Sequence, residues 1–556
     1  MKKIKFIVPI LALALFSCDN YLDINSPSPN DMLFTQASPA KLLPGAQTSC
    51  YRVQGTTMNQ LGNVFMNSWT RNVQSWGNGY DKELQLNLDT GFYSGISSGS
   101  QSLAAQIKNF QAIIDYPNPD GKYDNYIAAA KICKVHYVQQ LVDLYGDIPY
   151  SEAWKGIENT TPNYDDDYSI YQALFTELES ARSLITNASA NADDIAAYDV
   201  MLGGVMADWT NFANTIQLRM CLRMSAVTGA RATLRDQKLA DIAAGPFLST
   251  NVTVNPGFNN STDVQASPAF GAFAYLVSGT AQQNRTFITM TGHAYKALQS
   301  YSTTNWAAFG NNYQIVPGSG INYPNVLDPR SAKLFTVGSG TSSRRAVTQG
   351  STVVDVSTPT ATFPGLPCRL GLAGNFNLYN LAPGGTLPEY FACPGYVMTL
   401  TESLFLQAEA AVRYPGLFSG GQASFEAGIN EDFLMRNAGT ATAYVGLINA
   451  KPNFGWTGTD TQKLHAIMYQ KWIALMGVNA IQSYFDYTRT GFPVTPLPLG
   501  TLVQNKKPNR LMYATSEYVA NSAHVPAMIA ADCFTLNSHT PFWVPGAPNY
   551  YYLIVN

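Results

Sequence analysis

Charged side chains are scarce in this sequence. They make up 13% of its 556 residues, and the formal net charge is −3. No run of Lys or Arg supplies the electrostatic footprint that nucleic-acid-binding proteins need. We therefore do not expect nucleic acid among the ligands of this protein.

Sequence motifs of catalysis and metal binding are also scarce. The chain has no H-E-x-x-H and no C-x-x-C, and its only Gly-Lys pair does not form a phosphate-binding loop. Residues 95–99 match G-x-S-x-G around Ser97, but a Gly-containing loop precedes them where a nucleophile elbow needs a strand. Ser97, Ser98 and Ser100 are better explained as helix caps. We therefore predict a protein without catalytic residues, catalytic metal or cofactor.

One acidic run leaves a structural metal open. Asp165, Asp166 and Asp167 carry the oxygen ligands that calcium prefers. A solvated loop explains the same run and is favoured over a calcium site.

Apolar and aromatic residues, by contrast, are plentiful. Hydrophobic residues make up 46% of the chain and aromatic residues 12%, including 32 Tyr and 8 Trp. This supply is enough for a large buried core. A surface rich in aromatic rings and amides and poor in charge is suited to neutral polar ligands.

The N-terminus has the pattern of an export signal. A basic stretch, residues 1–5, precedes an apolar stretch, residues 6–16, that is too short for a permanent membrane span. Leu15, Phe16, Ser17 and Cys18 then resemble a bacterial lipobox. We expect cleavage after residue 17 and lipid attachment to Cys18, with several acyl chains giving a stable anchor.

Helical periodicity returns many times along the chain. Apolar residues at spacings of three and four predict helices over 48–67, 101–114, 126–145, 169–185, 208–225, 397–413 and 424–437. Arg219 and Arg223 form an i, i+4 row, for which structural pairing is favoured over a ligand role. The residues between about 250 and 398 are rich in Gly, Pro, Asn, Ser and Thr and predict a loop-dominated lobe with short strands.

Residues 461–493 are the most informative helical stretch. Leu464, Met468, Trp472 and Leu475 predict one apolar helix face, with polar residues opposite (Gln462, Lys463, Gln470 and Lys471). The stretch is too apolar for an isolated surface helix, so other helices must cover it. We interpret the residues toward its end as helix-stop and turn residues (Asp486, Arg489, Gly491 and Pro493).

Several runs of this chain resemble the SusD/RagB family of lipoproteins. They are QKWIALMGVNAIQSYFDYTRTGFP, DWTNFANTIQLRMCLRMS, LTESLFLQAEAAVR, LYGDIPYSEAW and the DPR at 328–330. The resemblance implies a mostly α fold, a tetratricopeptide-like superhelix of helix pairs with an inserted loop-rich lobe containing short strands. It also implies an outer-membrane lipoprotein, facing the cell exterior, that covers a SusC-like TonB-dependent β-barrel transporter and delivers nutrient to it.

The predicted organisation follows from these patterns. We expect a signal peptide at 1–17, a tether at 18–44, a first helix-pair region at 45–228, a loop-rich ligand-binding lobe at 229–398, a second helix-pair region at 399–493 and an irregular C-terminal segment at 494–556.

The candidate ligand site lies in two irregular stretches. The first interleaves aromatic rings with amide and charged groups (Trp69, Arg71, Asn72, Trp76, Asn78, Tyr80 and Asp81), and the second has the same character (Tyr301, Trp306, Asn312 and Tyr313). Rings on loops can cover the apolar faces of sugars while amides bond the hydroxyl groups, although such rings also serve loop packing. The resemblance places the family's ligand face in these two general regions.

We therefore predict non-catalytic capture of glycans or oligosaccharides. Capture of oligopeptides, as in RagB-like members, is the alternative for the same site. A secreted hydrolase is the third hypothesis, and it would need a paired-carboxylate or triad site that the sequence does not reveal.

Overall fold

The computed structural model describes residues 37–71, 83, 85–300, 323–335, 346–347, 349–350, 390–498 and 503–546. Within these ranges the chain is mostly helical, and its named strands form two sheets of two strands each. The prediction of a mostly α fold is thereby confirmed.

The helices before residue 250 form the first part of the scaffold. They are α2 (Pro39–Val53), the π-helical turn η2 (Gln54–Met58), α3 (Asn59–Phe65), η4 (Ser94–Ile96), α5 (Leu103–Gln106), α6 (Lys108–Ile114), α7 (Asp124–Tyr145), η5 (Gly156–Glu158), α8 (Asp167–Thr186), α9 (Met206–Arg223) and α10 (Ala230–Ile242). The first helix begins at Pro39, earlier than the predicted tether boundary at residue 44. Proline suits that position because its fixed φ fits the first turn, where its missing N–H costs no hydrogen bond.

The middle of the chain has short elements, as its composition predicts. They are β2 (Val252–Val254), α11 (Pro268–Phe273), α12 (Gln283–Phe287), β3 (Ile288–Met290), α13 (Gly292–Leu298), α15 (Ser331–Leu334) and β4 (Gly395–Met398). β2 pairs antiparallel with β4, and β3 pairs antiparallel with β1 (Trp69–Arg71). The strand β1 lies in a stretch for which the sequence predicts only a loop.

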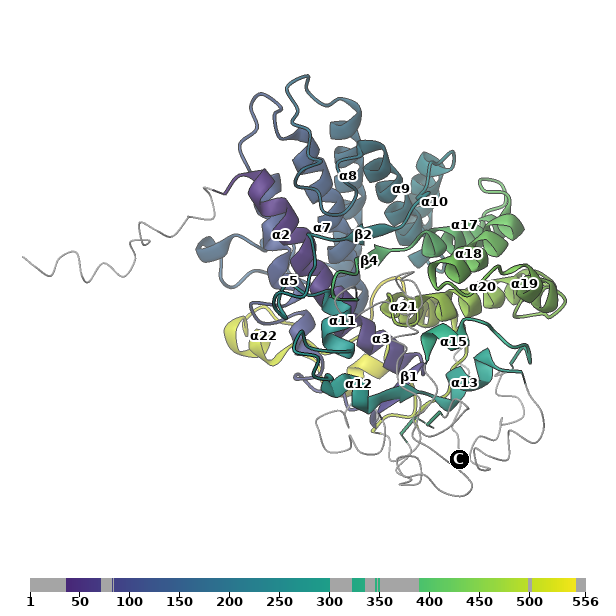
Figure 1. Ribbon diagram of the computed structural model, residues 1–556. Coiled ribbons are helices and arrows are strands. Elements are labelled where there is room, and N and C mark those ends of the chain that lie inside the picture. The colour runs from purple at the N-terminus through teal and green to yellow at the C-terminus, as the bar shows by residue number, and fades with distance from the viewer. Residues whose placement is uncertain are drawn as a thin grey trace, which may run out of the picture.

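The remaining helices complete the scaffold. They are α17 (Leu400–Arg413), α18 (Gly421–Met435), α19 (Thr442–Ile448), α20 (Asp460–Leu475), α21 (Ile481–Thr490), α22 (Thr515–Ala520) and η8 (Ala530–Phe534). In Figure 1 the helices α7, α8, α9, α10, α17 and α18 follow one another around one side of the molecule, and α11, α12, α13, α15 and β1 lie on the other side. α7 packs on α8, α9 packs on α10, and α17 packs on α18, α20 and α9.

The helix α20 is buried on all sides from His465 to Leu475. Trp472 is 1% exposed and donates from its Nε1 to Ser68 Oγ (2.9 Å). Gln470 and Lys471, which the sequence predicts on a polar face, are buried as well. Their burial differs from the prediction of an exposed polar face. It is possible because Arg330 donates to Gln470 and Asp486 pairs with Lys471.

Asp486 is the centre of a buried ion-pair network in α21. Its carboxylate lies 2.9 Å from Lys471 Nζ, 2.9 Å from Arg489 Nη2 and 3.8 Å from Arg223 Nη1. Arg489 also pairs with Glu409 of α17 at 2.5 Å. The sequence interpretation placed Asp486 and Arg489 among the residues that end the helix. In the structure they lie within α21 and pair with other buried charges. α21 runs on to Thr490, and Gly491, at φ 77°, ends it as the pattern predicts.

A second buried network joins the lobe to the scaffold. Arg330 contacts Asp328 (2.6 Å), Asp432 of α18 (2.8 Å) and Gln470 Oε1 of α20 (2.8 Å). Arg436 also donates to Asp432 at 2.8 Å. The DPR run thus holds α18 and α20 against the lobe.

Arg219 and Arg223 have the structural role that their spacing favours. Arg219 donates to Gln139 Oε1 (2.9 and 3.0 Å) and lies 3.5 Å from Glu402 of α17. Arg223 pairs with Asp143 of α7 at 3.0 Å. Both guanidinium groups are buried, so they join α9 to its neighbours and cannot reach a ligand in solvent.

Candidate functional site

The two predicted ligand stretches begin from one small sheet. β1 ends at Arg71, the last described residue before 72–82, and pairs with β3 so that Trp69 lies opposite Met290 and Arg71 opposite Ile288. β3 leads through Thr291 into α13, which ends at Leu298, shortly before the second stretch. Residues more than 200 positions apart are thereby held at one place (β1, α12 and α13 in Figure 1).

Thr291 holds the start of this arrangement together. Its hydroxyl donates to the carbonyl of Asn67 at 2.5 Å and accepts from the backbone N–H of Ala294, which makes it the N-cap of α13. Gln349 adds a second brace, because its amide donates to the carbonyls of Val64 and Trp69 at 2.8 and 3.0 Å. These hydrogen bonds tie β1, the end of α3 and the start of α13 to one another.

Trp69 belongs to the core at this base. Its side chain is 4% exposed and packs edge-on against Phe273 of α11, with ring centroids 5.3 Å apart. The sequence hypothesis gave Trp69 a sugar-covering role, and in this structure its ring has no open face. Pairing with β3 fixes the side-chain direction and turns the ring inward.

Arg71 and Glu83 stand on either side of residues 72–82. Arg71 is 2% exposed, and its Nη1 donates to Asn284 Oδ1 at 3.1 Å. Burial raises the pKa of Glu83, and the positive charge of Arg71 and a short hydrogen bond from Tyr93 (2.5 Å) oppose that rise. Their electrostatic attraction helps to hold together the two ends from which the segment departs.

The other predicted site residues lie outside the described residues. They are Cys18, Asn72, Trp76, Asn78, Tyr80, Asp81, Tyr301, Trp306, Asn312 and Tyr313. Their roles in lipid attachment and ligand binding stay predictions.

A group of buried basic side chains that the sequence reasoning missed lies at α13. His293 of α13 is in hydrogen-bond contact with Tyr323 (Nδ1 to OH 2.8 Å), and its ring lies 5.1 Å from that of Trp472. Burial lowers the pKa of Lys296 and of Lys507 to about 7. Burial, and then the charges of Lys507 and Lys296, lower the pKa of His293. The i, i+3 spacing of His293 and Lys296 is the sequence signal that could have revealed part of this group. The proximity of Lys507 results from the tertiary fold and has no local sequence signal.

The acidic cluster differs from the predicted run by one member. The carboxylates of Asp147, Asp166 and Asp167 lie within 4.8 Å of one another. Asp165 instead accepts from the backbone N–H groups of Tyr150 and Ser151, both at 2.9 Å. Asp166 caps α8, so local hydrogen bonds account for much of the cluster. Burial raises the pKa of Asp167 to about 7, and the charges of Asp147 and Asp166 add to the rise.

Ser97 follows η4 and does not lie on a strand-to-helix elbow. The cap of the next helix is Ser102, whose Oγ accepts from the Ala105 N–H at 3.2 Å, so the expectation of capping by Ser97, Ser98 or Ser100 was misplaced. Ser98 instead bonds to Ser516 (Oγ to Oγ 2.6 Å).

Comparison with known proteins identifies this scaffold. The model of the family described as SusD-like, starch-binding and associating with the outer membrane matches residues 29–266 and 328–514. The chain belongs to this SusD-like family. No match was found among curated proteins.

Solved structures share the fold at low sequence identity. A chitin-binding SusD homologue from Flavobacterium johnsoniae is 19% identical, with 91% of this chain and 99% of that chain covered and a TM-score of 0.64. A SusD homologue from Parabacteroides distasonis is 18% identical, with 92% and 97% covered and a TM-score of 0.65. A SusD-like protein from Bacteroides thetaiotaomicron is 20% identical, with 90% and 98% covered and a TM-score of 0.62.

The family description places such proteins at the outer membrane. Among the helices of the described ranges, none is both long and apolar enough to cross a bilayer.

Proposed function

We propose that this protein captures glycans at the cell surface without altering them and delivers them to a SusC-like TonB-dependent transporter. It is held to the outer membrane by lipid on Cys18 and faces the exterior. The observation that supports this ligand site is the pairing of β1 with β3, since it brings together the chain segments that precede the two aromatic-rich stretches. Family membership and the chitin-binding relative support the ligand class.

The proposed contacts follow from the chemistry of neutral sugars. The rings of Trp76, Tyr80, Trp306 and Tyr313 cover sugar C–H faces, while Asn72, Asn78, Asp81 and Asn312 bond hydroxyl groups. Covering ~50 Å² of apolar sugar surface contributes roughly 1.3 kcal/mol per ring. Several rings are needed for useful affinity, and release to a transporter stays fast.

Isothermal titration against chito-oligosaccharides, malto-oligosaccharides and oligopeptides tests the ligand class. We expect Trp76→Ala to weaken glycan binding roughly tenfold, the equivalent of about 1.4 kcal/mol, without a change in the urea midpoint. Trp69→Ala should lower the stability first, because its ring is buried. Trp456→Ala is the matched control, since this half-buried indole packs on Phe425 of α18 within the helical scaffold.

Four results would contradict parts of the proposal. Unchanged glycan binding in Trp76→Ala would contradict the proposed ligand site. Selective peptide binding would change the ligand class, and product formation from an oligosaccharide would make the protein an enzyme. Labelled palmitate that attaches equally to Cys18→Ala would refute the lipid anchor.

A further inference from the structure

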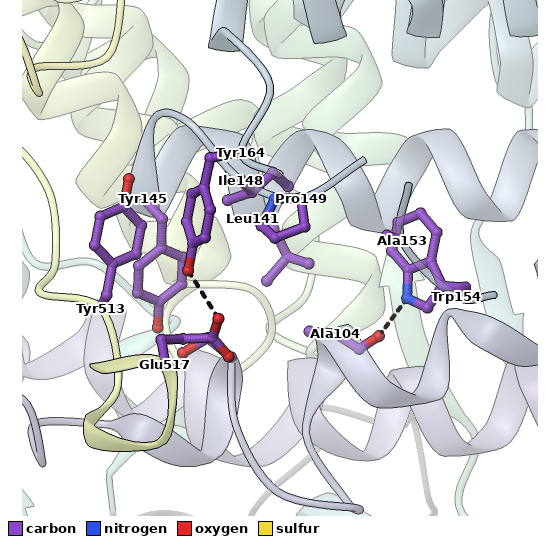
Figure 2. Close-up of a pocket in the computed structure, with 11 residues that line it drawn as sticks. Ala104, Leu141, Tyr145, Ile148, Pro149, Ala153, Trp154, Tyr164, Tyr513 and Glu517 are labelled. Carbon is purple, nitrogen blue, oxygen red and sulfur yellow. Dashed lines mark hydrogen bonds between the residues drawn. The ribbon is translucent and has the colours of Figure 1, made fainter. Parts of the chain in front are cut away.

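A cavity of about 150 Å³ lies between α5, the end of α7, the loop after α7 and the start of α22 (Figure 2). Nine of its eleven lining residues are aliphatic or aromatic, and the two polar ones are Ser97 and Glu517. An apolar cavity of this size admits one group about as large as benzene.

Its aromatic walls are fixed by hydrogen bonds at their polar ends. Tyr164 donates to Glu517 Oε2 (2.8 Å), Trp154 Nε1 donates to the carbonyl of Ala104 (2.8 Å), and Tyr513 donates to the carbonyl of Asp147 (2.8 Å). Tyr513 also stacks on Tyr145 with ring centroids 6.3 Å apart. The rings are thus held in place before any ligand arrives.

Trp154 is held at a conformational cost. Its φ is +61°, in the left-handed region that bulky side chains avoid. Such strain persists only where surrounding contacts fix it, and it concentrates at functional positions. Here those contacts are its bond to Ala104 and the edge-on ring of Tyr150, 6.2 Å away.

The cavity has a polar end and an apolar end. Figure 2 shows Tyr145, Tyr164 and Tyr513 gathered with Glu517 at one end, and Trp154 with Ala104 at the other, with Leu141 between them. A carboxylate among aromatic rings is the environment that attracts an organic cation. The apolar end leaves room for an aliphatic stem.

We propose that this cavity binds the lysine side chain of a polypeptide, with its ammonium group at Glu517 among the three tyrosines and its methylene stem along Leu141 toward Trp154. The inference does not depend on the glycan proposal. A sugar ring fits the cavity less well, because hydroxyl groups around its whole edge would be buried against apolar walls without partners.

The surface beside the cavity favours a basic partner. Residues 151–166, which contain three of the lining residues, carry four carboxylates (Glu152, Glu158, Asp165 and Asp166) against a single Lys155. Hydrogen bonds from Asn163, and then from Asn159, lower the pKa of Glu152. Two apolar side chains close in sequence to lining residues are exposed to solvent: Ile157 is 97% exposed and Val519 is 76% exposed. Exposed apolar side chains are expected of a surface that a protein segment covers.

Two cations already near the walls have their own partners. Lys134 lies 5.8 Å from the Trp154 ring centroid and is paired with Glu177 at 3.1 Å. Arg510 lies 4.6 Å from the Tyr513 centroid and donates to the carbonyls of His539 and Leu511. Neither lines the cavity or bonds to Glu517, so that carboxylate remains the local acceptor for a ligand.

The test compares acetyl-Gly-Lys-Gly-amide with its norleucine analogue, which has the same stem and no charge, by saturation-transfer NMR and calorimetry. We expect the lysine peptide to bind at least tenfold more tightly. Glu517→Gln should abolish that preference, and Glu431→Gln in α18 makes the same chemical change at a distance and should leave it intact. Ala153→Phe fills the cavity from its half-buried wall and should block both peptides, with circular dichroism and thermal melting confirming the fold.

Several outcomes would overturn the proposal. Equal binding of the two peptides, or lysine binding that survives Glu517→Gln and Ala153→Phe, would place no cation in the cavity. Displacement of the lysine peptide by a chito-oligosaccharide would assign the cavity to sugar. Tighter binding of butylammonium than of the peptide would assign it to a free amine.

Discussion

Two regions of this molecule shift the pKa values of their buried ionisable side chains in opposite senses: one favours the charged form and the other disfavours it. In the helical scaffold, oppositely charged partners keep them ionised: burial works against the charge, but Lys471, Arg489 and Arg223 together lower the pKa of Asp486, and Glu409 with Asp486 raises the pKa of Arg489. At α13 and the nearby Lys507, burial dominates and lowers the pKa of Lys296 and Lys507 to about 7. Neighbouring groups, more than depth, decide whether a buried side chain stays charged.

The difference explains which sequence features identified the family. The recognisable runs contain the charged members of the scaffold networks, such as Asp486 and Arg330. Removing one partner from such a network leaves another charge buried and unpaired. These residues define the scaffold.

The largest effect should come from breaking the Asp486 network. Asp486→Ala leaves Lys471 and Arg489 without a shared carboxylate in the core, and we expect a loss of about 3–5 kcal/mol in the free energy of unfolding. Urea denaturation followed by circular dichroism measures it. Asp486→Asn keeps the side-chain shape, so its free energy of unfolding should lie between those of the wild type and Asp486→Ala. A loss below about 1 kcal/mol for Asp486→Ala would show that the network contributes little.

A pH-dependent effect should mark the other region. The pKa of Lys507 is about 7 in the folded protein and about 10.4 in the unfolded chain. The unfolded state therefore binds more protons between these values, and stability rises with pH there. Lys507→Met should remove about 2 kcal/mol of the gain between pH 7 and pH 9, obtained by subtracting the variant's denaturation curves from those of the wild type.

The same gain in Lys507→Met as in wild type would contradict the view that burial dominates at this position. Lys463→Met serves as the control, because Lys463 pairs with the exposed Asp460 at the surface of α20. It should leave the pH dependence unchanged.

The smallest effect should come from an exposed cap of the scaffold. Thr459 forms a capping box with Gln462 at the start of α20. Thr459→Ala should cost about 1 kcal/mol at any pH between 6 and 9, because no titrating group is involved. Thermal melting measures it, Thr457→Ala just outside the box is the matched control, and a loss as large as that of Asp486→Ala would contradict the ranking.

The sequence by itself determined the helical scaffold. Periodicity over 126–145, 169–185 and 397–413 predicted α7, α8 and α17 within a few residues, since an amphipathic helix buries one face wherever it packs. It also identified the family through runs that match the scaffold.

Tertiary structure decided which side chains are buried and which distant residues come into contact. Trp69 is buried because β1 pairs with a strand more than 200 residues away, and Gln470 and Lys471 are buried because partners approach from other elements. The cavity at Glu517 is assembled from separate stretches of chain. Local pattern cannot reveal such features, because the burial and pKa of a side chain depend on contacts made across the chain.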